Sequence, residues 1–221
     1  MLHHGPARMI RPTALLYDWD DTLADGWAGI TAAMNAALAA AGMPAWSVEQ
    51  MRARARRSLR EAFPDLFGPG WEQARDVFYA ELHACHLAHL QPKPGAAAAL
   101  AAGARWPQAV VSNKAGAVLR REVVHLGWRA HFGAVIGAGD AAADKPDAAP
   151  LHLALDRIGV RPSPAVWYIG DTALDMQAAR AAGCTAVLLG DAAHDGGAAR
   201  AAPDLNPADA DALAMLLCNI I

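Results

Sequence analysis

The sequence predicts an α/β protein, a doubly wound parallel sheet into which an all-helical domain is inserted. Three observations predict this fold. From residue 94 onwards, short apolar segments alternate with helical patterns, which is typical of parallel strands joined by crossover helices. Before that point, residues 13–25 contain a short apolar run that ends in a cluster of aspartates. About 65 residues of helical pattern, in which we expect no strand, separate this first run from the alternating part.

The first strand ends in three acidic residues. Residues 13–25 read Thr-Ala-Leu-Leu-Tyr-Asp-Trp-Asp-Asp-Thr-Leu-Ala-Asp, so Asp18, Asp20 and Asp21 follow a buried strand. In open α/β sheets, ligands bind at this carboxyl edge. Asp18 and Asp20 are two residues apart and point the same way in an extended backbone, so we interpret them as the working pair. Carboxylates gathered so closely repel each other, and a hard divalent cation such as Mg²⁺ is therefore the expected partner.

The insertion is expected to be helical throughout. Helical patterns, bounded by serine, glycine or proline, cover residues 27–42, 47–63 and 71–89. The second of these is expected to end before Pro64, because proline removes a backbone donor. We therefore expect residues 25–93 to form a helical cap domain, and residues 1–24 and 94–221 to form the core that contains the sheet.

The rest of the core is expected to alternate between helix and strand. The strands are expected over residues 108–112, 133–136, 165–169 and 185–189. The helices are expected over residues 94–103, 115–127, 147–159, 173–182 and 207–218. Crossover connections of this kind place helices on both faces of a parallel sheet.

Polar residues follow three of the later strands. Ser112 ends one strand with a hydroxyl that suits a phosphate oxygen, and Lys145 follows another after a glycine-rich loop. Asp171 and Asp175 follow a third. Taken singly, these residues are ordinary helix caps or surface charges. Together they bring a hydroxyl, an ammonium and further carboxylates to the edge of the sheet that carries Asp18, which favours a catalytic site.

The four motifs resemble those of the haloacid dehalogenase superfamily of phosphohydrolases. The matching residues are Asp18-x-Asp20-x-Thr22, Ser112, Lys145 and Gly170-Asp171-x-x-x-Asp175. The resemblance covers nearly the whole chain, because the insertion lies where the family has its helical cap. Residues 111–114 and 170–183 look most like the branch that contains phosphoglycolate phosphatases and β-phosphoglucomutase. Asp21 departs from the pattern, since the family usually has glycine there.

The resemblance implies a Mg²⁺-dependent phosphatase that acts on a small phosphomonoester, either phosphoglycolate-like or a sugar phosphate. Asp18 would attack phosphorus and form an aspartyl-phosphate, and Asp20 would act as general acid and then as general base. Ser112 would bind a phosphoryl oxygen, and Lys145 would neutralise charge. The residues implied to hold Mg²⁺ are Asp18, Asp20 through its backbone carbonyl, Asp171 and Asp175.

Substrate selection is expected to involve Asn113 and the basic face of the cap. The stretch Ser58-Leu59-Arg60-Glu61 is similar to the part of the cap with which sugar-phosphate members contact a distal anionic group. Arg60 is thus the first candidate for a specificity residue and Arg57 the second. The alternative interpretation of these arginines is a solvated helix face.

Three other functions remain open at this stage. A phosphomutase of the β-phosphoglucomutase type would use the same core residues. A phospho-aspartate signalling module shares the acids, hydroxyl and lysine, but it would be about half as long and would lack the insertion. A non-catalytic binding protein on this scaffold would have lost Asp18 or Asp20, and both are present. Dehalogenases of the family lack the second acid, and its phosphonate-cleaving members use a cap lysine, whereas residues 26–91 contain none.

Composition narrows the choice of partner and compartment. A net charge of −3 and a pI near 6.3 argue against nucleic acid or an anionic membrane as the main partner. Three unevenly spaced cysteines and the lack of an apolar signal core favour the reducing cytoplasm. Both a monomer and a homodimer are compatible with the sequence. Only three of the 19 basic side chains are lysines, at positions 93, 114 and 145, which suggests that each is kept for its compact ammonium.

Overall fold

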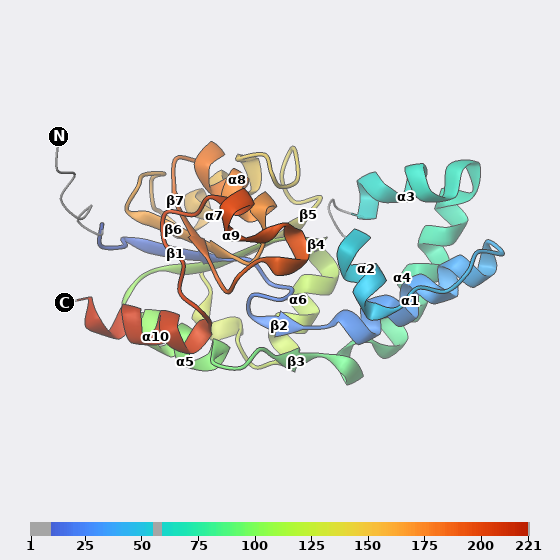
Figure 1. Ribbon diagram of the computed structural model, residues 1–221, viewed down its shortest axis with the longest axis horizontal. Helices are drawn as coiled ribbons and strands as arrows, with labels where there is room; N and C mark the ends of the chain where they lie inside the picture. The colour runs from blue at the N-terminus through green and yellow to red at the C-terminus, as the bar shows by residue number, and fades with distance from the viewer. Residues whose placement is uncertain (1–9, 55–58, 221) are drawn as a thin grey trace.

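The protein contains a five-stranded, fully parallel sheet, which confirms the predicted fold class (Figure 1). The structure is a computed structural model that describes residues 10–54 and 59–220, with the side chain of Arg60 left out. The strand order is β5-β4-β1-β6-β7. The strands are β1 (Ala14–Tyr17), β4 (Gln108–Ala115), β5 (Ala134–Ala138), β6 (Val166–Gly170) and β7 (Thr185–Leu188). The central strand is therefore β1, the strand that leads into the aspartate cluster.

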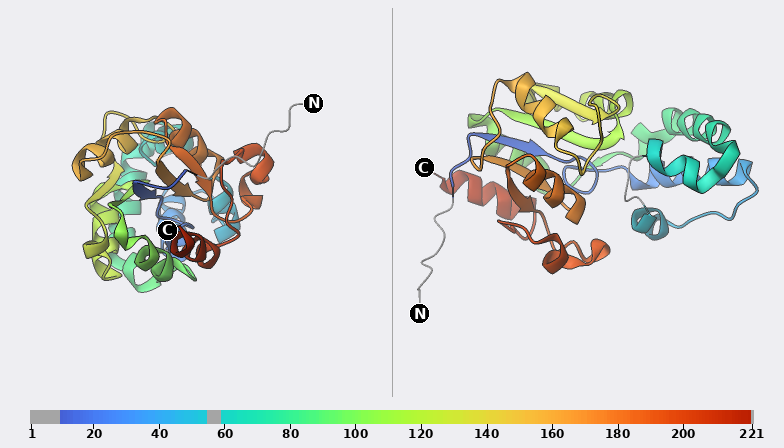
Figure 2. Two further views of the ribbon diagram at one scale, coloured as in Figure 1. Left: turned by 90° about the vertical axis from the view of Figure 1, so that its left-hand side faces the viewer. Right: turned by 90° about the horizontal axis from the view of Figure 1, so that it is seen from above.

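Helices cover both faces of this sheet because alternate residues of each strand point to opposite sides. Leu15 and Tyr17 of β1 pack in one apolar cluster with helices from one layer, whereas Leu16 packs in a second cluster on the other face. The helices of the first layer are α5 (Ala96–Ala102), α6 (Gly116–His125) and α10 (Ala210–Asn219). Those of the second are α7 (Ala149–Ile158), α8 (Ala173–Ala181) and α9 (Gly197–Ala201). Figure 2 shows the two layers from two further directions.

The inserted segment forms a group of helices beyond the end of the sheet to which β1 runs (Figures 1 and 2). Its helices are α1 (Trp27–Ala40), α2 (Val48–Arg54), α3 (Leu59–Phe67) and α4 (Trp71–His89). They share an apolar cluster that includes Met34, Phe63 and Phe78 and extends to Val118 of α6. Short 3₁₀ turns complete the described elements, namely η1 (Gly68–Gly70), η2 (Gly103–Arg105), η3 (Arg129–His131) and η4 (Ala193–Asp195). Within the described residues, no helix combines the length and apolarity needed to cross a bilayer.

Two short strands at the root of the insertion were not predicted. They are β2 (Ala24–Asp25) and β3 (Gln91–Pro92), which pair in antiparallel fashion. Two residues are too few to produce a periodic pattern, so the sequence carries no signal for this ribbon. The pairing ties together the two connections between the sheet and the inserted helices.

The predicted end of the second cap helix before Pro64 is wrong. Helix α3 continues through Pro64 to Phe67. Phe63 is 1% exposed, and its ring centroid lies 5.1 Å from that of Phe67 and 5.5 Å from that of Phe78. This aromatic packing offsets the backbone hydrogen bond that proline removes, a loss that typically costs about 3 kcal/mol.

Candidate active site

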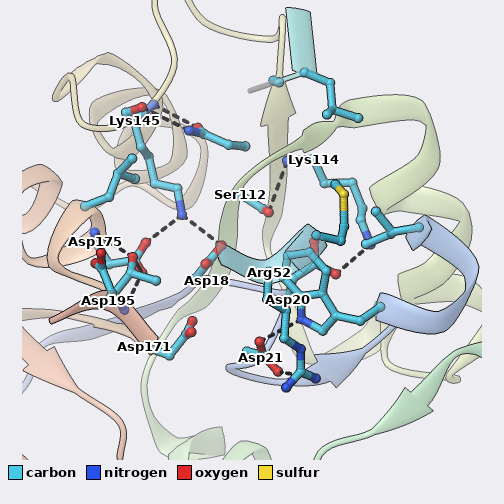
Figure 3. Close-up of a pocket in the computed structure, with 18 of the residues that line it drawn as sticks. Asp18, Asp20, Asp21, Arg52, Ser112, Lys114, Lys145, Asp171, Asp175 and Asp195 are labelled. Atoms are coloured by element: carbon cyan, nitrogen blue, oxygen red, sulfur yellow. Dashed lines mark hydrogen bonds and ion pairs between the residues drawn. The ribbon is translucent and has the colours of Figure 1, made fainter. Parts of the chain in front are cut away.

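A cavity of about 590 Å³ lies between the carboxyl ends of the strands and the inserted helices. The core residues predicted from the sequence all line it: Asp18, Asp20, Ser112, Asn113, Lys145, Asp171 and Asp175. In Figure 3 the side chains of Lys145 and Asp175 point toward Asp18, with Ser112 and Asp171 nearby. The order of parallel strands alone accounts for this convergence, since their carboxyl ends share one edge.

Lys145 lies between two buried carboxylates. Its Nζ atom is 2.8 Å from Oδ1 of Asp18 and 2.7 Å from Oδ1 of Asp175 (Figure 3). The same ammonium donates to the hydroxyl of Tyr168 at 2.8 Å, and that hydroxyl donates to the carbonyl of Val111 at 2.9 Å. Lys145 is only 3% exposed, so its charge is directed into the site rather than into solvent. Tyr168 is a site residue that the sequence analysis missed, because a tyrosine within an apolar strand looks like core.

Asp171 directly follows β6, and one of its carboxylate oxygens lies within 4.8 Å of one of Asp18. The hydroxyl of Thr22 donates to Oδ1 of Asp171 at 2.9 Å, so Thr22 links the aspartate loop to the strand end that carries the last motif. Nε2 of His194, which precedes α9, lies 3.4 Å from the other carboxylate oxygen. Sequence reasoning missed His194, since its loop contains no recognisable motif.

Three buried carboxylates could together hold a metal ion. Ligand atoms of Asp18, Asp171 and Asp175 lie within 4.8 Å of one another. When all three carboxylates are ionised, they and the ammonium of Lys145 carry a net charge of −2. Burial, reinforced by the neighbouring carboxylates, raises the pKa of Asp18 to about 8 even though Lys145 opposes the shift. Burial also raises the pKa of Asp171. Oxygen ligands and a deficit of positive charge fit a hard dication such as Mg²⁺.

The sequence of the last motif explains its local geometry. Asp175 and Thr172 form a reciprocal capping box at the start of α8, in which the backbone N–H of Thr172 donates to Asp175 at 3.1 Å. Gly170 is required because a Cβ atom at this position would lie 2.4 Å from the side chain of Asp175. Asp175 thus caps a helix and also pairs with Lys145. Capping leaves it free to act as a metal ligand as well, and that role stays a prediction.

Strand β4 is irregular where it enters the site. Its pairing with β5 shifts between Val111 and Ala115, and such an irregularity re-aims side chains. Ser112 lines the cavity, and its Oγ accepts from the backbone N–H of Lys114 at 3.2 Å. The side chain of Asn113 exchanges two hydrogen bonds of 2.9 Å with the backbone of Lys145. Asn113 therefore holds the loop that carries Lys145, and its predicted contact with substrate stays a prediction.

Asp20 points toward a second ammonium rather than toward Asp18. Nζ of Lys114 lies 2.7 Å from Oδ1 of Asp20 and 2.7 Å from Oε2 of Glu122, which in turn accepts from the indole N–H of Trp19 at 2.6 Å. Burial raises the pKa of Asp20 to about 6, although Lys114 opposes the shift. Burial also lowers the pKa of Lys114, but the charges of Asp20 and Glu122 outweigh it and raise the pKa above its usual value.

All three lysines pair with the aspartate loop. Lys145 contacts Asp18, Lys114 contacts Asp20, and Nζ of Lys93 lies 3.3 Å from Oδ1 of Asp21. The scarcity of lysine in the sequence was therefore a signal for Lys114, which the sequence analysis did not assign to the site. Glu122 gave no such signal, because an acid within an amphipathic helix is ordinary.

The inserted helices contribute a mainly apolar wall to the cavity. The described residues on this side are Trp27, Ile30, Met51, Arg52, Leu59, Phe78, Tyr79 and Leu82. Of the two arginines predicted to select substrate, Arg57 lies outside the described residues, as does the side chain of Arg60. Both therefore stay predictions. Arg52 was not singled out, although it belongs to the same basic stretch.

The sequence of this chain matches a known protein family and is similar to known proteins. The profile of haloacid dehalogenase-like hydrolases matches residues 15–189. A phosphoglycolate phosphatase from Xylella fastidiosa (strain 9a5c) is 34% identical over 186 residues, which cover 80% of this chain and 80% of that protein. The chain is thus similar to a relative over most of the length of both.

Two solved structures share the fold. A HAD-superfamily hydrolase from Ehrlichia chaffeensis is 26% identical, with a TM-score of 0.67 over 96% of this chain and 98% of that one. A haloacid dehalogenase-like family hydrolase from Streptococcus pneumoniae is 22% identical, with a TM-score of 0.79 over 93% of this chain and 97% of that one. At 22% identity, the second likeness supports the fold alone.

Proposed function

The chain belongs to the haloacid dehalogenase-like hydrolase family, and on this premise we propose that it is a Mg²⁺-dependent phosphatase of small phosphomonoesters that works through an aspartyl-phosphate. The observation that carries the proposal is the position of Asp18. Asp18 directly follows the central strand and lines the cavity. Its carboxylate lies 2.8 Å from the ammonium of Lys145 and shares a potential metal site with Asp171 and Asp175. An anionic nucleophile that must approach a phosphate dianion needs such compensation.

In the first step, an oxygen of Asp18 forms a bond to phosphorus while the bond from phosphorus to the ester oxygen breaks. Lys145 neutralises Asp18 and the incoming phosphoryl group, and the hydroxyl of Ser112 donates to a phosphoryl oxygen. The carboxylates of Asp18 and Asp171, with support from Asp175, would hold Mg²⁺, which would supply further charge neutralisation. The product of this step is an aspartyl-phosphate, which splits one difficult displacement into two easier ones.

Asp20 carries the proton in both steps. It protonates the departing ester oxygen, and as a carboxylate it then removes a proton from the water that hydrolyses the aspartyl-phosphate. A pKa raised by burial to about 6 supports this role, because Asp20 keeps its proton at neutral pH more often than an ordinary aspartate does. Lys114, which also pairs with Glu122, positions the carboxylate of Asp20.

We propose that residues 25–93 form a cap that closes over this site and excludes bulk water. The apolar cluster that joins α1–α4 and the two-stranded ribbon at the root of the insertion support a cap that moves as a unit on two adjacent connections. Closure would bring the apolar wall of the cavity against the leaving group of the substrate.

The proposed function is tested by phosphate release from a panel of phosphomonoesters that includes 2-phosphoglycolate and hexose phosphates. We expect release with Mg²⁺ and a loss of at least about 100-fold in rate when the metal is removed with EDTA, because charge neutralisation is a principal source of catalysis here. Release that is indifferent to EDTA would contradict the metal role. A sugar bisphosphate that phosphorylates Asp18 without any net release of phosphate would favour a phosphomutase instead.

The pH dependence of stability tests the metal site without any activity assay. Because the pKa of Asp18 rises from 3.8 to about 8 on folding, the metal-free native state binds more protons than the unfolded state between these pH values. Its stability therefore falls as pH rises from about 4 to about 8. Mg²⁺ binds the ionised carboxylates, so we expect it to raise Tm more at pH 8 than at pH 5.

At about 100 times its Kd, Mg²⁺ is expected to stabilise the protein by about 2.7 kcal/mol, or roughly 5–10 °C in Tm for a chain of this size. Differential scanning calorimetry with Mg²⁺ or EDTA at the two pH values measures the effect. Asp171→Asn serves as the control and should lose most of the Mg²⁺ response. An equal response at both pH values would argue against the buried carboxylates as the binding site.

A further inference from the structure

Asp21 occupies a position with unusual backbone geometry. Its φ of 60° lies in the left-handed region, where glycine is favoured and aspartate or asparagine are the best tolerated alternatives. The side chain lines the cavity and is only 10% exposed, so it neither faces open solvent nor lies among the three carboxylates of the metal site. An aspartate here adds a negative charge to the cavity that glycine would not carry.

The carboxylate of Asp21 contacts three separate segments around the cavity. Oδ1 lies 3.2 Å from the guanidinium of Arg52 on α2 and 3.3 Å from Nζ of Lys93, which follows β3. Oδ2 accepts from the indole N–H of Trp27, the first residue of α1, at 2.7 Å. Figure 3 shows Asp21 and Arg52 together beside Asp20.

Arg52, a basic residue of the inserted helix α2, takes part in these contacts through its guanidinium. Arg52 lines the cavity, and its guanidinium lies 5.6 Å from the centre of the Trp27 ring. It also pairs with Asp25 at 3.4 Å. Two cations, Arg52 and Lys93, and two anions, Asp21 and Asp25, thus sum to zero charge. Without Asp21, the same cluster would carry a net charge of +1 next to the cavity.

We propose that Asp21 is a specificity-determining residue that disfavours phosphate esters with a negatively charged leaving group. This inference rests on the proposed phosphatase function and refines its substrate class toward uncharged leaving groups. Asp21 acts in two ways. Its own charge repels a carboxylate on the substrate, and its ion pair engages the guanidinium of Arg52, which would otherwise bind that carboxylate. The apolar wall formed by residues such as Ile30 and Met51 suits an uncharged group equally well.

A matched pair of substrates isolates the effect. 2-Phosphoglycolate and 2-hydroxyethyl phosphate differ in a carboxylate against a hydroxymethyl group, so the ratio of their kcat/KM values reports the response to the extra charge. We expect Asp21→Asn to raise this ratio in favour of 2-phosphoglycolate by about tenfold, which corresponds to about 1.4 kcal/mol. Asp21→Gly should behave in the same way. Asparagine and glycine both tolerate the left-handed backbone conformation at position 21, so both variants should fold.

Asp25→Asn is the matched control, since it removes a charge from the same cluster at a position 44% exposed that does not line the cavity. A change of less than about threefold is expected there because exposed ion pairs are weak. In the double variant Asp21→Asn with Arg52→Gln, the guanidinium that Asp21→Asn releases is absent. The kcat/KM ratio in favour of 2-phosphoglycolate should therefore rise less than in Asp21→Asn alone. Unchanged ratios in both Asp21 variants, or an equal rise with Asp25→Asn, would overturn the inference.

Binding of the same two ligands to the Mg²⁺-loaded protein provides a second readout by calorimetry. If the wild-type protein hydrolyses neither ester, the proposed function fails for these substrates, but the ratio of their Kd values in wild type and Asp21→Asn still decides the role of Asp21. A Kd ratio that shifts about tenfold toward 2-phosphoglycolate supports the inference, and one that does not shift refutes it.

Discussion

Asp18→Asn is expected to abolish phosphate release, with a fall in kcat of at least about 10⁴-fold. Loss of a catalytic nucleophile typically removes this much or more of the rate, because the remaining binding groups cannot replace the covalent step. The substitution is nearly isosteric and leaves Lys145 its other partner, Asp175, at 2.7 Å. The measurement is a Mg²⁺-dependent phosphate-release assay with the best substrate of the panel.

The fold of this variant is monitored separately, so that loss of activity is not confused with unfolding. Asp18→Asn removes one of three mutually repelling carboxylates, and the metal-free Tm should therefore not decrease by more than a few degrees. Mass spectrometry after incubation with substrate should detect a phosphorylated wild-type chain and an unmodified variant. Residual activity within about tenfold of wild type would rule out Asp18 as the nucleophile.

Lys145→Met is expected to damage both activity and stability. Lys145 is 3% exposed and pairs with Asp18 and Asp175, so its loss leaves two carboxylates without their common cation. Removal of one partner from a buried ion pair typically costs about 3–5 kcal/mol. We expect the free energy of unfolding to fall by this amount in EDTA, and kcat to fall by about 10³-fold, since the charge that offsets the phosphoryl group is lost.

Lys93→Met provides a matched control for stability, because Lys93 also pairs with an acid of the aspartate loop. Its side chain is 30% exposed, so its loss should cost less than about 1 kcal/mol. Urea titrations of both variants and the wild type in EDTA measure the two costs. Similar costs for the two lysines would show that the buried ammonium has no special structural role. Mg²⁺ should partly restore the stability of Lys145→Met, because a dication compensates the same carboxylates.

Much of the fold was predictable because its signals are local. The apolar run of β1 and the alternation after residue 94 define parallel strands within a few residues of where they occur, and α4 has the bounds 71–89 that its pattern predicts. Proline was a less reliable marker of a helix end, since α3 continues beyond Pro64, where Phe63 packs against Phe78. The two-residue strands β2 and β3 are too short to show a hydrophobic pattern in the sequence. Their pairing depends on which segments meet in the folded chain.

The sequence by itself determined the fold class and the set of groups that meet at the edge of the sheet. Asp18, Ser112, Lys145 and Asp171 each follow a strand, and because parallel strands end at one edge, their order along the chain was enough to bring them together. Their carboxylates indicated a metal site, and the resemblance of the four motifs to a known family then implied a metal-assisted phosphatase.

Only the tertiary structure decided which charges pair around that set. Lys114 lies 94 residues from Asp20, and Lys93 lies 72 residues from Asp21, so no periodicity or spacing relates the partners. Ion pairing depends on distance and burial, and these follow from how the inserted helices and the irregular end of β4 pack around the cavity. The acids of the site could therefore be predicted from the sequence. The partners of Asp20 and Asp21 could be identified only in the tertiary structure, because they come from distant segments of the chain.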